Sequence, residues 1–464
     1  MTKKPKKLVS TIVACATAPG QSAISIVRMS GPKSLSIAGC IWRSTKISST
    51  KQIKPRVLNL GWLFENDNNI DQAMLVYMPS PHSFTGEDIV EIHLHGSMAI
   101  VHKAIQLCVG NGARLAQNGE FSKRAYLNSK LDLSQAEAIG ELISSSNARM
   151  MRLASKQLAG ELSKNISTIK SQLLRVTAHL TATLDFSEED IEAQDISGIV
   201  ISISEIESSV KELLKGSENL GVVREGFHVV LIGLPNAGKS TLLNKLLGYD
   251  RSIVTEIAGT TRDTITESIM LDDTIIQITD TAGLHSSRDK VEKIGIQRTI
   301  EEAKNSDYIL ILVEPTTQDQ TQQFLEKNNI SKHLNKNNCL VVFTKSDTAN
   351  KSNTTSDYFT QFNSVSVSTK TTKGIDELKD LLSKSSQKTA GQGDLKLLTN
   401  RQIVLLEKLS TKLSDISKQL TNKTPSDILT VELQSAITIC NEITGEEVTQ
   451  EVIDEVFSNF CIGK

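Results

Sequence analysis

The stretch that decides the fold reads Gly233-Leu234-Pro235-Asn236-Ala237-Gly238-Lys239-Ser240. It matches the pattern G-x-x-x-x-G-K-[S/T], and it lies between an apolar run at 228–232 and a helix-forming run at 241–247. In such a loop the glycines let backbone N–H groups close around a phosphate, the lysine balances the charge of the phosphate oxygens, and the serine hydroxyl can bind Mg²⁺. A tight strand-to-helix turn without a ligand is the alternative, and the context disfavours it.

Alternating strands and helices surround this loop. Apolar runs at 228–232, 274–279, 308–313 and 339–343 predict buried strands, and helical stretches lie between them. Strands that are buried on both faces and separated by helices are typical of a doubly wound parallel sheet. We therefore expect an independent nucleotide-binding module over residues 226–388.

Apolar residues at helical spacing flank this module on both sides, from Leu158 to Leu213 before it and from Leu406 to Phe460 after it. Because the ends of an inserted module usually lie close together, we predict one helical domain interrupted by the α/β module. An interhelical loop is expected at 186–190. The stretch 383–394, rich in Ser, Lys, Gln and Gly, is expected to form a flexible return joint.

The first 125 residues mix short β-rich runs with Gly and Pro turns. Strands are expected at 25–29, 74–77 and 89–94, and a helix near 99–109. This pattern indicates a small N-terminal α/β domain.

Composition excludes several classes of protein. The chain has 464 residues and a formal net charge of −2, and no apolar run approaches the ~20 residues of a membrane span. Its six cysteines include no C-x-x-C pair, so neither a disulfide framework nor a thiolate zinc site is indicated, and a cytoplasmic location is expected. The balanced charge provides no global basic field, so RNA binding would need a partner or a local patch.

Further motifs follow the phosphate loop in order: Thr260-Thr261, Asp280-Thr281-Ala282-Gly283, Thr344-Lys345-Ser346-Asp347 and Ser368-Thr369-Lys370. This set resembles the GTPase superfamily of Ras-like translation factors. The resemblance implies that Thr261 binds Mg²⁺, that Asp280 holds Mg²⁺ through water, and that Asp347 pairs with the N1 and N2 hydrogens of guanine. A carboxylate that accepts two donors absent from adenine favours GTP over ATP. The usual Asn at the start of the base motif is Thr344 here.

The hydrolytic group also departs from that superfamily. Leu284 follows Gly283 where Ras-like enzymes carry a water-orienting Gln. The side-chain carbonyl of Asn236 could hold a monovalent cation near the phosphates, in place of an arginine finger. A loop Asn that accepts a backbone hydrogen bond is an equally good interpretation of the spacing.

A more specific resemblance extends along nearly the whole chain. It is carried by Asn236 with the loop 255–263, by Val291-Glu292-Lys293-Ile294-Gly295, by Phe121-Ser122-Lys123-Arg124-Ala125, and by Phe460-Cys461-Ile462-Gly463-Lys464. With these motifs the chain resembles the MnmE (TrmE) family of GTPases that help to modify wobble uridines of tRNA.

This resemblance implies a multidomain fold of α/β and all-α parts. Residues 1–125 would form an α/β tetrahydrofolate-binding and dimerisation domain, residues 126–225 and 389–464 the two parts of the helical domain, and residues 226–388 an inserted Ras-like P-loop G domain. It also implies a cytoplasmic homodimer that works on tRNA with the FAD-dependent partner MnmG (GidA), as a heterotetramer, with no membrane association.

The resemblance further assigns residues of the G domain. Lys239 and Glu292 would serve catalysis, Glu292 by orienting the attacking water, although an exposed helix carboxylate is its simpler interpretation. Mg²⁺ would be bound by Ser240 and Thr261, and K⁺, which would let G domains dimerise, by Asn236, Thr255, Ile257 and Thr260. The residues implied to contact GTP and its cations are Asn236, Ala237, Gly238, Lys239, Ser240, Thr241, Thr255, Glu256, Ile257, Ala258, Gly259, Thr260, Thr261, Asp280, Thr281, Ala282, Gly283, Thr344, Lys345, Asp347 and Ser368.

Four residues outside the G domain match the family's contacts with 5-formyltetrahydrofolate or a related one-carbon folate: Arg28, Glu87, Lys130 and Lys464. A glutamate can pair with the donor edge of a pterin, and cations can pair with the carboxylates of the cofactor. Taken singly, each residue is more often a surface charge. The resemblance also implicates Cys461 in the modification reaction, with an inert packed thiol as the alternative.

Two other functions remain open from sequence. A ribosome-assembly GTPase of the Era or Der type would require a basic RNA-binding appendage, and a dynamin-like scaffold would require a lipid-binding helix or anchor. Neither feature is evident in the sequence.

Overall fold

A computed structural model describes residues 10–46, 49, 52–185, 193–217, 219–249, 265–280, 290–347, 356–389, 391, 395–422 and 424–464. The chain divides into two compact units, one formed by Met1–Ile143, Ser155–Lys211 and Thr399–Lys464, the other by Ser144–Ala154 and Glu212–Leu398. The first unit is therefore assembled from three separate segments of sequence.

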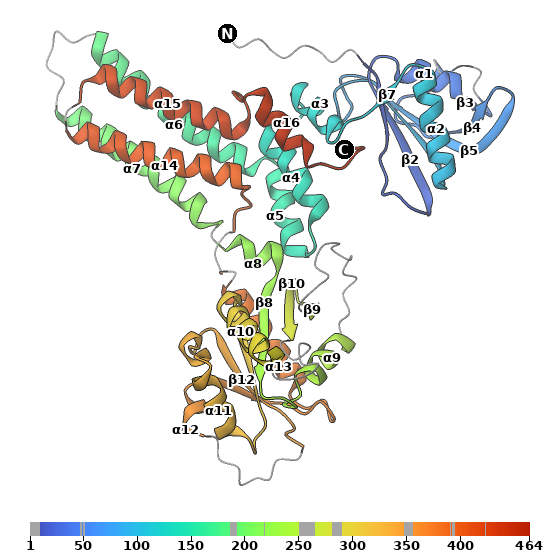
Figure 1. Cartoon of the computed structure of the whole chain (residues 1–464). Coiled ribbons are helices and arrows are strands. Elements are labelled where there is room, and N and C mark those ends of the chain that lie inside the picture. Colours follow the sequence, from blue (N-terminus) through green and yellow to red (C-terminus); the bar gives the residue numbers. More distant parts are fainter. Residues whose placement is uncertain are drawn as a thin grey trace. The chain divides into compact units, whose positions relative to one another are not determined.

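A seven-stranded sheet forms the N-terminal part of the first unit, in the order β3-β4-β5-β6-β2-β1-β7 (Figure 1). Its strands are β1 (Ile12–Cys15), β2 (Ser22–Ser30), β3 (Trp42–Ser44), β4 (Asn59–Glu65), β5 (Asn68–Met78), β6 (Ile89–Gly96) and β7 (Arg114–Leu115). Helices α1 (Ser34–Ile41) and α2 (Met98–Gly110) contribute to the same buried core as the sheet. The three expected strands and the expected helix are confirmed.

Helices of different lengths complete the first unit: α3 (Glu120–Leu127), α4 (Leu133–Ser144), α6 (Glu161–Asp185), α7 (Ala193–Lys215), α14 (Asn400–Thr421), α15 (Ser426–Thr444) and α16 (Gln450–Ser458). Helix α5 (Ala148–Leu158) belongs to both units. Helix α15 packs against both α6 and α14, so segments before and after the inserted module share one bundle (Figure 1). The predicted interruption of a helical domain is confirmed. The loop expected at 186–190 lies outside the described residues.

A buried polar cluster joins the two sequence segments of the bundle. Arg401, at the start of α14, donates to both carboxylate oxygens of Glu137 in α4, at 2.9 and 2.8 Å. The side chain of Gln402 donates to the same carboxylate, and Gln157 donates to the side chain of Gln402 at 3.2 Å. Because a buried carboxylate is stable only when its oxygens are paired, this cluster fixes where α14 re-enters the bundle.

The second unit contains a six-stranded sheet in the order β13-β12-β11-β8-β10-β9. Its strands are β8 (Phe227–Gly233), β9 (Ile265–Leu271), β10 (Thr274–Asp280), β11 (Tyr308–Val313), β12 (Cys339–Phe343) and β13 (Asn363–Ser366). Among the described strands of this sheet, only β9 runs antiparallel to the others. Alternate residues of β8 enter different cores, Val229 and Leu231 on one face and Val230 and Ile232 on the other. The doubly wound sheet is confirmed.

Helices accompany both faces of this sheet: α8 (Leu220–Glu225), α9 (Lys239–Tyr249), α10 (Lys290–Asn305), α11 (Gln318–Lys327), α12 (Asp357–Thr360), α13 (Ile375–Thr389) and the 3₁₀ turn η3 (Ile330–His333). No helix in the described part of the chain is long and apolar enough to cross a membrane.

The expected flexible joint at 383–394 is wrong over its first half. Helix α13 continues to Thr389, and the side chain of Ser383 is buried and donates a hydrogen bond to Asp272. Leu378 and Leu382 lie one turn apart in the core, so their burial stabilises the helix. The polar residues that come next in the sequence then continue this helix. Of the remaining stretch, the structure describes only Gly391.

Candidate functional site

The loop between β8 and α9 has backbone angles suited to an anion. Asn236 and Gly238 have positive φ angles of 64° and 91°. Left-handed residues in a loop of this kind can turn successive N–H groups toward an anion. A Cβ atom on Gly233 would lie 2.6 Å from the backbone oxygen of Leu312, so only glycine fits there. A Cβ on Gly238 would meet nothing within 4 Å, so this part of the loop borders open space. The loop therefore fits an anionic ligand.

The side chain of Lys239 is hydrogen-bonded to the backbone of this loop. Its side chain is 4% exposed, and Nζ donates to the backbone oxygens of Gly233 at 2.8 Å and Leu234 at 2.9 Å. Burial lowers the pKa of Lys239, and the nearby Asp280 carboxylate acts in the opposite direction. The phosphate oxygens of a nucleotide would offset the burial of this charge.

Ser240 and Asp280 form the candidate Mg²⁺ site. The Ser240 hydroxyl, at the start of α9, donates to Oδ2 of Asp280, the last residue of β10, at 2.6 Å. Hydroxyl and carboxylate oxygens are ligands that Mg²⁺ prefers, so these two residues fit the ion. The parallel pairing of β8 and β10 brings the ends of both strands to the same edge of the sheet.

The base-binding motif lies where the neighbouring strands β12 and β13 end. The Ser368 hydroxyl donates to Oδ1 of Asp347 at 2.7 Å, and this hydrogen bond is the main reason why the pKa of Asp347 is lowered. Asp347 is therefore a stable anion that can accept two N–H groups of guanine. Lys345 is left-handed, with φ of 55°, and its Nζ donates to Glu314 at 2.9 Å.

Thr344, which stands where the superfamily has Asn, has a buried Oγ1 without a hydrogen-bond partner in the described structure. Its backbone N–H donates to the oxygen of Val313 at 2.9 Å, which holds the residue at the ends of β11 and β12. A buried hydroxyl without a partner is unfavourable, so Thr344 is positioned for a hydrogen bond that the described part of the protein does not supply.

Several predicted nucleotide contacts lie outside the described residues. Asn236, Ser240 and Thr241 are exposed and Ala237 is buried. Glu292 falls on α10, but its side chain is outside the described part. The predicted residues about which the structure says nothing are Thr255, Glu256, Ile257, Ala258, Gly259, Thr260, Thr261, Thr281, Ala282 and Gly283.

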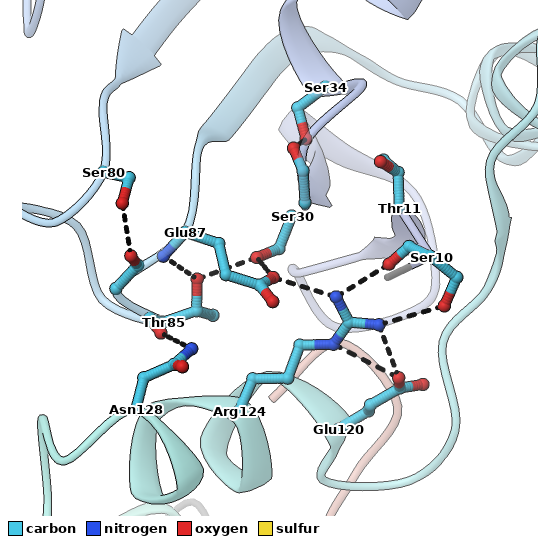
Figure 2. A network of polar contacts seen from close by, with 12 residues as sticks. Ser10, Thr11, Ser30, Ser34, Ser80, Thr85, Glu87, Glu120, Arg124 and Asn128 are labelled. Atoms are coloured by element: carbon cyan, nitrogen blue, oxygen red, sulfur yellow. Dashed lines mark hydrogen bonds and ion pairs between the residues drawn. The ribbon is translucent and has the colours of Figure 1, made fainter. Parts of the chain in front are cut away.

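A second candidate site lies around α3 in the N-terminal part, and we name its four predicted folate residues, Arg28, Glu87, Lys130 and Lys464, the α3 site. The guanidinium of Arg28, on β2, lies 5.8 Å from the ring centroid of Phe121 in α3, and its Nε donates to Glu91 at 2.7 Å. Oε2 of Glu87 accepts a hydrogen bond from Arg124 of α3 at 2.8 Å (Figure 2).

The two lysines of the α3 site reach the same helix through their backbones. The N–H of Lys130 donates to the oxygen of Ala125 at 2.8 Å, and the oxygen of Lys464 accepts the N–H of Phe121 at 3.0 Å. The first N–H groups of a helix have no partner within it, so the last segment of the chain satisfies one of them. The structure thus brings all four predicted residues to one helix.

Cys461 is exposed, which argues against the packed-thiol alternative. Its backbone oxygen accepts the N–H of Gly119 at 3.4 Å, just before α3. A Cβ atom on Gly463 would lie 2.1 Å from the oxygen of Cys15, so the segment containing Cys461 lies close against the end of β1.

Sequence reasoning missed the residues that hold Glu87. Arg124 lies within the motif Phe121-Ser122-Lys123-Arg124-Ala125, but the sequence indicates no role for it or for Ser30. The one local signal was the spacing of Glu120 and Arg124, which form an ion pair four residues apart on α3. The partnership with Glu87 depends on tertiary structure and has no local signature.

Two family models match the chain. The model of the MnmE helical domain matches residues 133–461, and the model of the GTP-binding protein TrmE N-terminus matches residues 11–130. Together they include the α/β domain, the bundle and the inserted nucleotide-binding unit.

Full-length relatives agree with these matches. The tRNA modification GTPase MnmE of Legionella pneumophila (strain Paris) is 40% identical over 460 residues, covering 98% of this chain and 100% of the relative. The proteins of the same name from Thermotoga petrophila and Aquifex aeolicus are 35% and 37% identical, over 98% of this chain and 100% and 99% of the relatives. The chain belongs to the MnmE family of tRNA modification GTPases.

Proposed function

We propose that this GTPase drives the attachment of a carboxymethylaminomethyl-type group to C5 of the wobble uridine of tRNA, with a one-carbon folate bound at the α3 site. The observation that carries this proposal is the convergence of Arg28, Glu87, Lys130 and Lys464 on α3, in a different compact unit from the phosphate loop. The two sites are separate in the fold, so GTP hydrolysis and folate chemistry belong to different parts of one enzyme.

The donor set of the α3 site fits a folate such as 5-formyltetrahydrofolate. The carboxylate of Glu87 is suited to the donor edge of the pterin, and three cationic side chains are suited to the carboxylates of the glutamate tail. When bound, the folate would supply the one-carbon unit. The exposed thiol of Cys461 lies in the same terminal segment as Lys464 and is our candidate for a reacting group.

In the G domain, Lys239 would bind the phosphates, and Ser240, Asp280 and Thr261 would hold Mg²⁺, directly or through water. Leu284 cannot orient water by hydrogen bonding, so that task falls to Glu292 in this proposal. The Asn236 side chain, with Thr255, Ile257 and Thr260, would hold K⁺ as two G domains close on each other. The K⁺ would then supply positive charge beside the phosphates.

The proposed assembly is a homodimer that works with the FAD-dependent partner MnmG as a heterotetramer. The formal net charge of −2 supports a division of labour in which the partner makes many of the contacts that bind tRNA. Redox chemistry would belong to that partner.

Mass analysis of tRNA nucleosides tests the proposal. Deletion of the gene should remove the modified wobble uridine, and the wild-type gene should restore it. Complementation with Glu87→Ala and with Asp280→Asn should fail, the first through the folate site and the second through the Mg²⁺ site. Wobble uridines that are unchanged in the deletion strain would refute the modification step. A defect in ribosomal subunits with intact tRNA would instead favour an assembly GTPase.

A further inference from the structure

We propose that Arg124 and Ser30 are positioning residues that orient the carboxylate of Glu87 toward the folate. This inference rests on the proposed function, because it takes the α3 site as a folate site. It adds two residues that contact Glu87 and gives them a defined task in ligand recognition.

One oxygen of Glu87 is held by two donors. Oε2 accepts the Ser30 hydroxyl at 2.8 Å and Nη1 of Arg124 at 2.8 Å, from opposite elements of the fold (Figure 2). Oε1 has no partner in the described part of the chain, and the Glu87 side chain is 16% exposed. Two donors on one oxygen fix the rotamer, so the second oxygen is presented in one direction only.

Arg124 is itself immobilised. Its side chain is 1% exposed, and its guanidinium also donates to Oε1 of Glu120 at 2.9 Å and to the backbone oxygen of Ser10 at 2.8 Å. Glu120 in turn accepts from Arg114 and from the N–H of Gln117. The guanidinium therefore has one geometry, and it transmits that geometry to Glu87.

Ser30 is fixed in the same way. Its hydroxyl lies 2.7 Å from Oγ1 of Thr85, and that oxygen accepts the backbone N–H of Glu87 at 3.2 Å. The backbone oxygen of Thr85 accepts the side chain of Asn128, just after α3. The loop that carries Glu87 is thus held at both its backbone and its side chain.

Burial of a guanidinium between two carboxylates is an expensive way to stabilise a fold, because an apolar side chain of similar volume often does as well. The same arrangement is favourable when a carboxylate must be oriented before a ligand arrives, because little rotamer freedom is then lost on binding. The network is therefore best explained by recognition at Glu87.

The test is a double-mutant cycle on the full chain, with the dissociation constant of 5-formyltetrahydrofolate measured by calorimetry. Arg124→Lys keeps the positive charge but loses the planar guanidinium that bonds both Glu87 and Glu120. Ser30→Ala removes the other donor to Glu87. Each should weaken folate binding about tenfold. Glu87→Ala should weaken it further, and in that background Arg124→Lys should add less than about twofold.

The matched control is Lys123→Gln, which removes a cation from the neighbouring position of α3. Lys123 pairs with Asp454, not with Glu87, so folate affinity should not change. A purely structural Arg124 would give additive losses in the cycle, and that result would overturn the inference. If Arg124→Lys does not fold, Ser30→Ala alone decides, because wild-type affinity in that variant would equally overturn it. Failure of the wild-type protein to bind folate would instead refute the proposed folate site, and this inference with it.

Discussion

The hydroxyl of Ser240 donates to the carboxylate of Asp280 at 2.6 Å, so two oxygens suited to Mg²⁺ already lie together at one edge of the sheet. Removing the hydroxyl should weaken Mg²⁺ binding without altering the sheet. We expect Ser240→Ala to raise the Mg²⁺ concentration for half-maximal GTP hydrolysis by about tenfold or more. Ser240→Thr is the matched control, because it keeps the hydroxyl. An unchanged Mg²⁺ titration for Ser240→Ala would show that the hydroxyl is not a ligand.

Thr344 offers a test of a hydroxyl that has no partner within the described protein. Replacement by the isosteric Val removes an unsatisfied buried group, so without nucleotide we expect the free energy of unfolding to stay the same or to rise by about 1 kcal/mol. Affinity for GDP should fall, because the hydroxyl would no longer be available to the base site. Thermal unfolding with and without GDP measures both effects. A lower melting temperature of the nucleotide-free variant would contradict the expectation.

A variant at Asn236 can show whether its side chain binds a cation or only stabilises the loop. Its left-handed φ of 64° would strain Ala, so Asn236→Gly is the better variant, since Gly adopts this φ without strain. If the side-chain oxygen binds K⁺, the ratio of GTP turnover in KCl to that in NaCl should fall to about one in this variant. Equal rates in the two salts for the wild-type protein would remove the cation from the mechanism.

Lys239 predicts a pH dependence of stability in the absence of nucleotide. Burial lowers its folded-state pKa below the ordinary value of 10.5. Below the folded-state pKa the lysine is charged in both states and the cost of burial is fully present. Between that pKa and 10.5 the unfolded chain holds a proton that the folded protein has released, so wild-type stability rises with pH across this window.

The measurement compares wild-type and Lys239→Met proteins by urea unfolding at about pH 7.5 and about pH 9.5. The free energy of unfolding of the wild-type protein, relative to that of Lys239→Met, should be larger at the higher pH. Lys418→Met is the control, because the Lys418 side chain is 71% exposed. The same shift in both variants would rule out burial of Lys239 as its cause.

The sequence predicted the central strands of the G domain because they are continuous apolar runs that both faces of the sheet bury. It missed β13, a four-residue edge strand with one buried residue, Val365, and β9, whose pairing with β10 is set by a short turn. A four-residue edge strand such as β13 has too few buried positions to give a periodic signal. The error at Ser383 had the opposite cause, because tertiary docking of Leu382 overrode a loop-like composition.

The phosphate loop and the motif Thr344-Lys345-Ser346-Asp347 could be recognised in the sequence because each consists of consecutive residues. The support for Glu87 could not, because Ser30, Glu87 and Arg124 come from a strand, a loop and a helix that only the folded domain brings together.

The contacts between α3 and the last segment of the chain cannot form until synthesis has reached that segment. Asn118 donates to the backbone oxygen of Ser458, 340 residues later. The N–H groups of Gly119 and Phe121 donate to the backbone oxygens of Cys461 and Lys464. Domains generally fold as they leave the ribosome, the N-terminal one first. Here the nucleotide-binding unit is synthesised before Ser458, Cys461 and Lys464. The second unit, which ends at Leu398, is therefore fully synthesised before the last residue of the α3 site, although the other three residues of that site are made first.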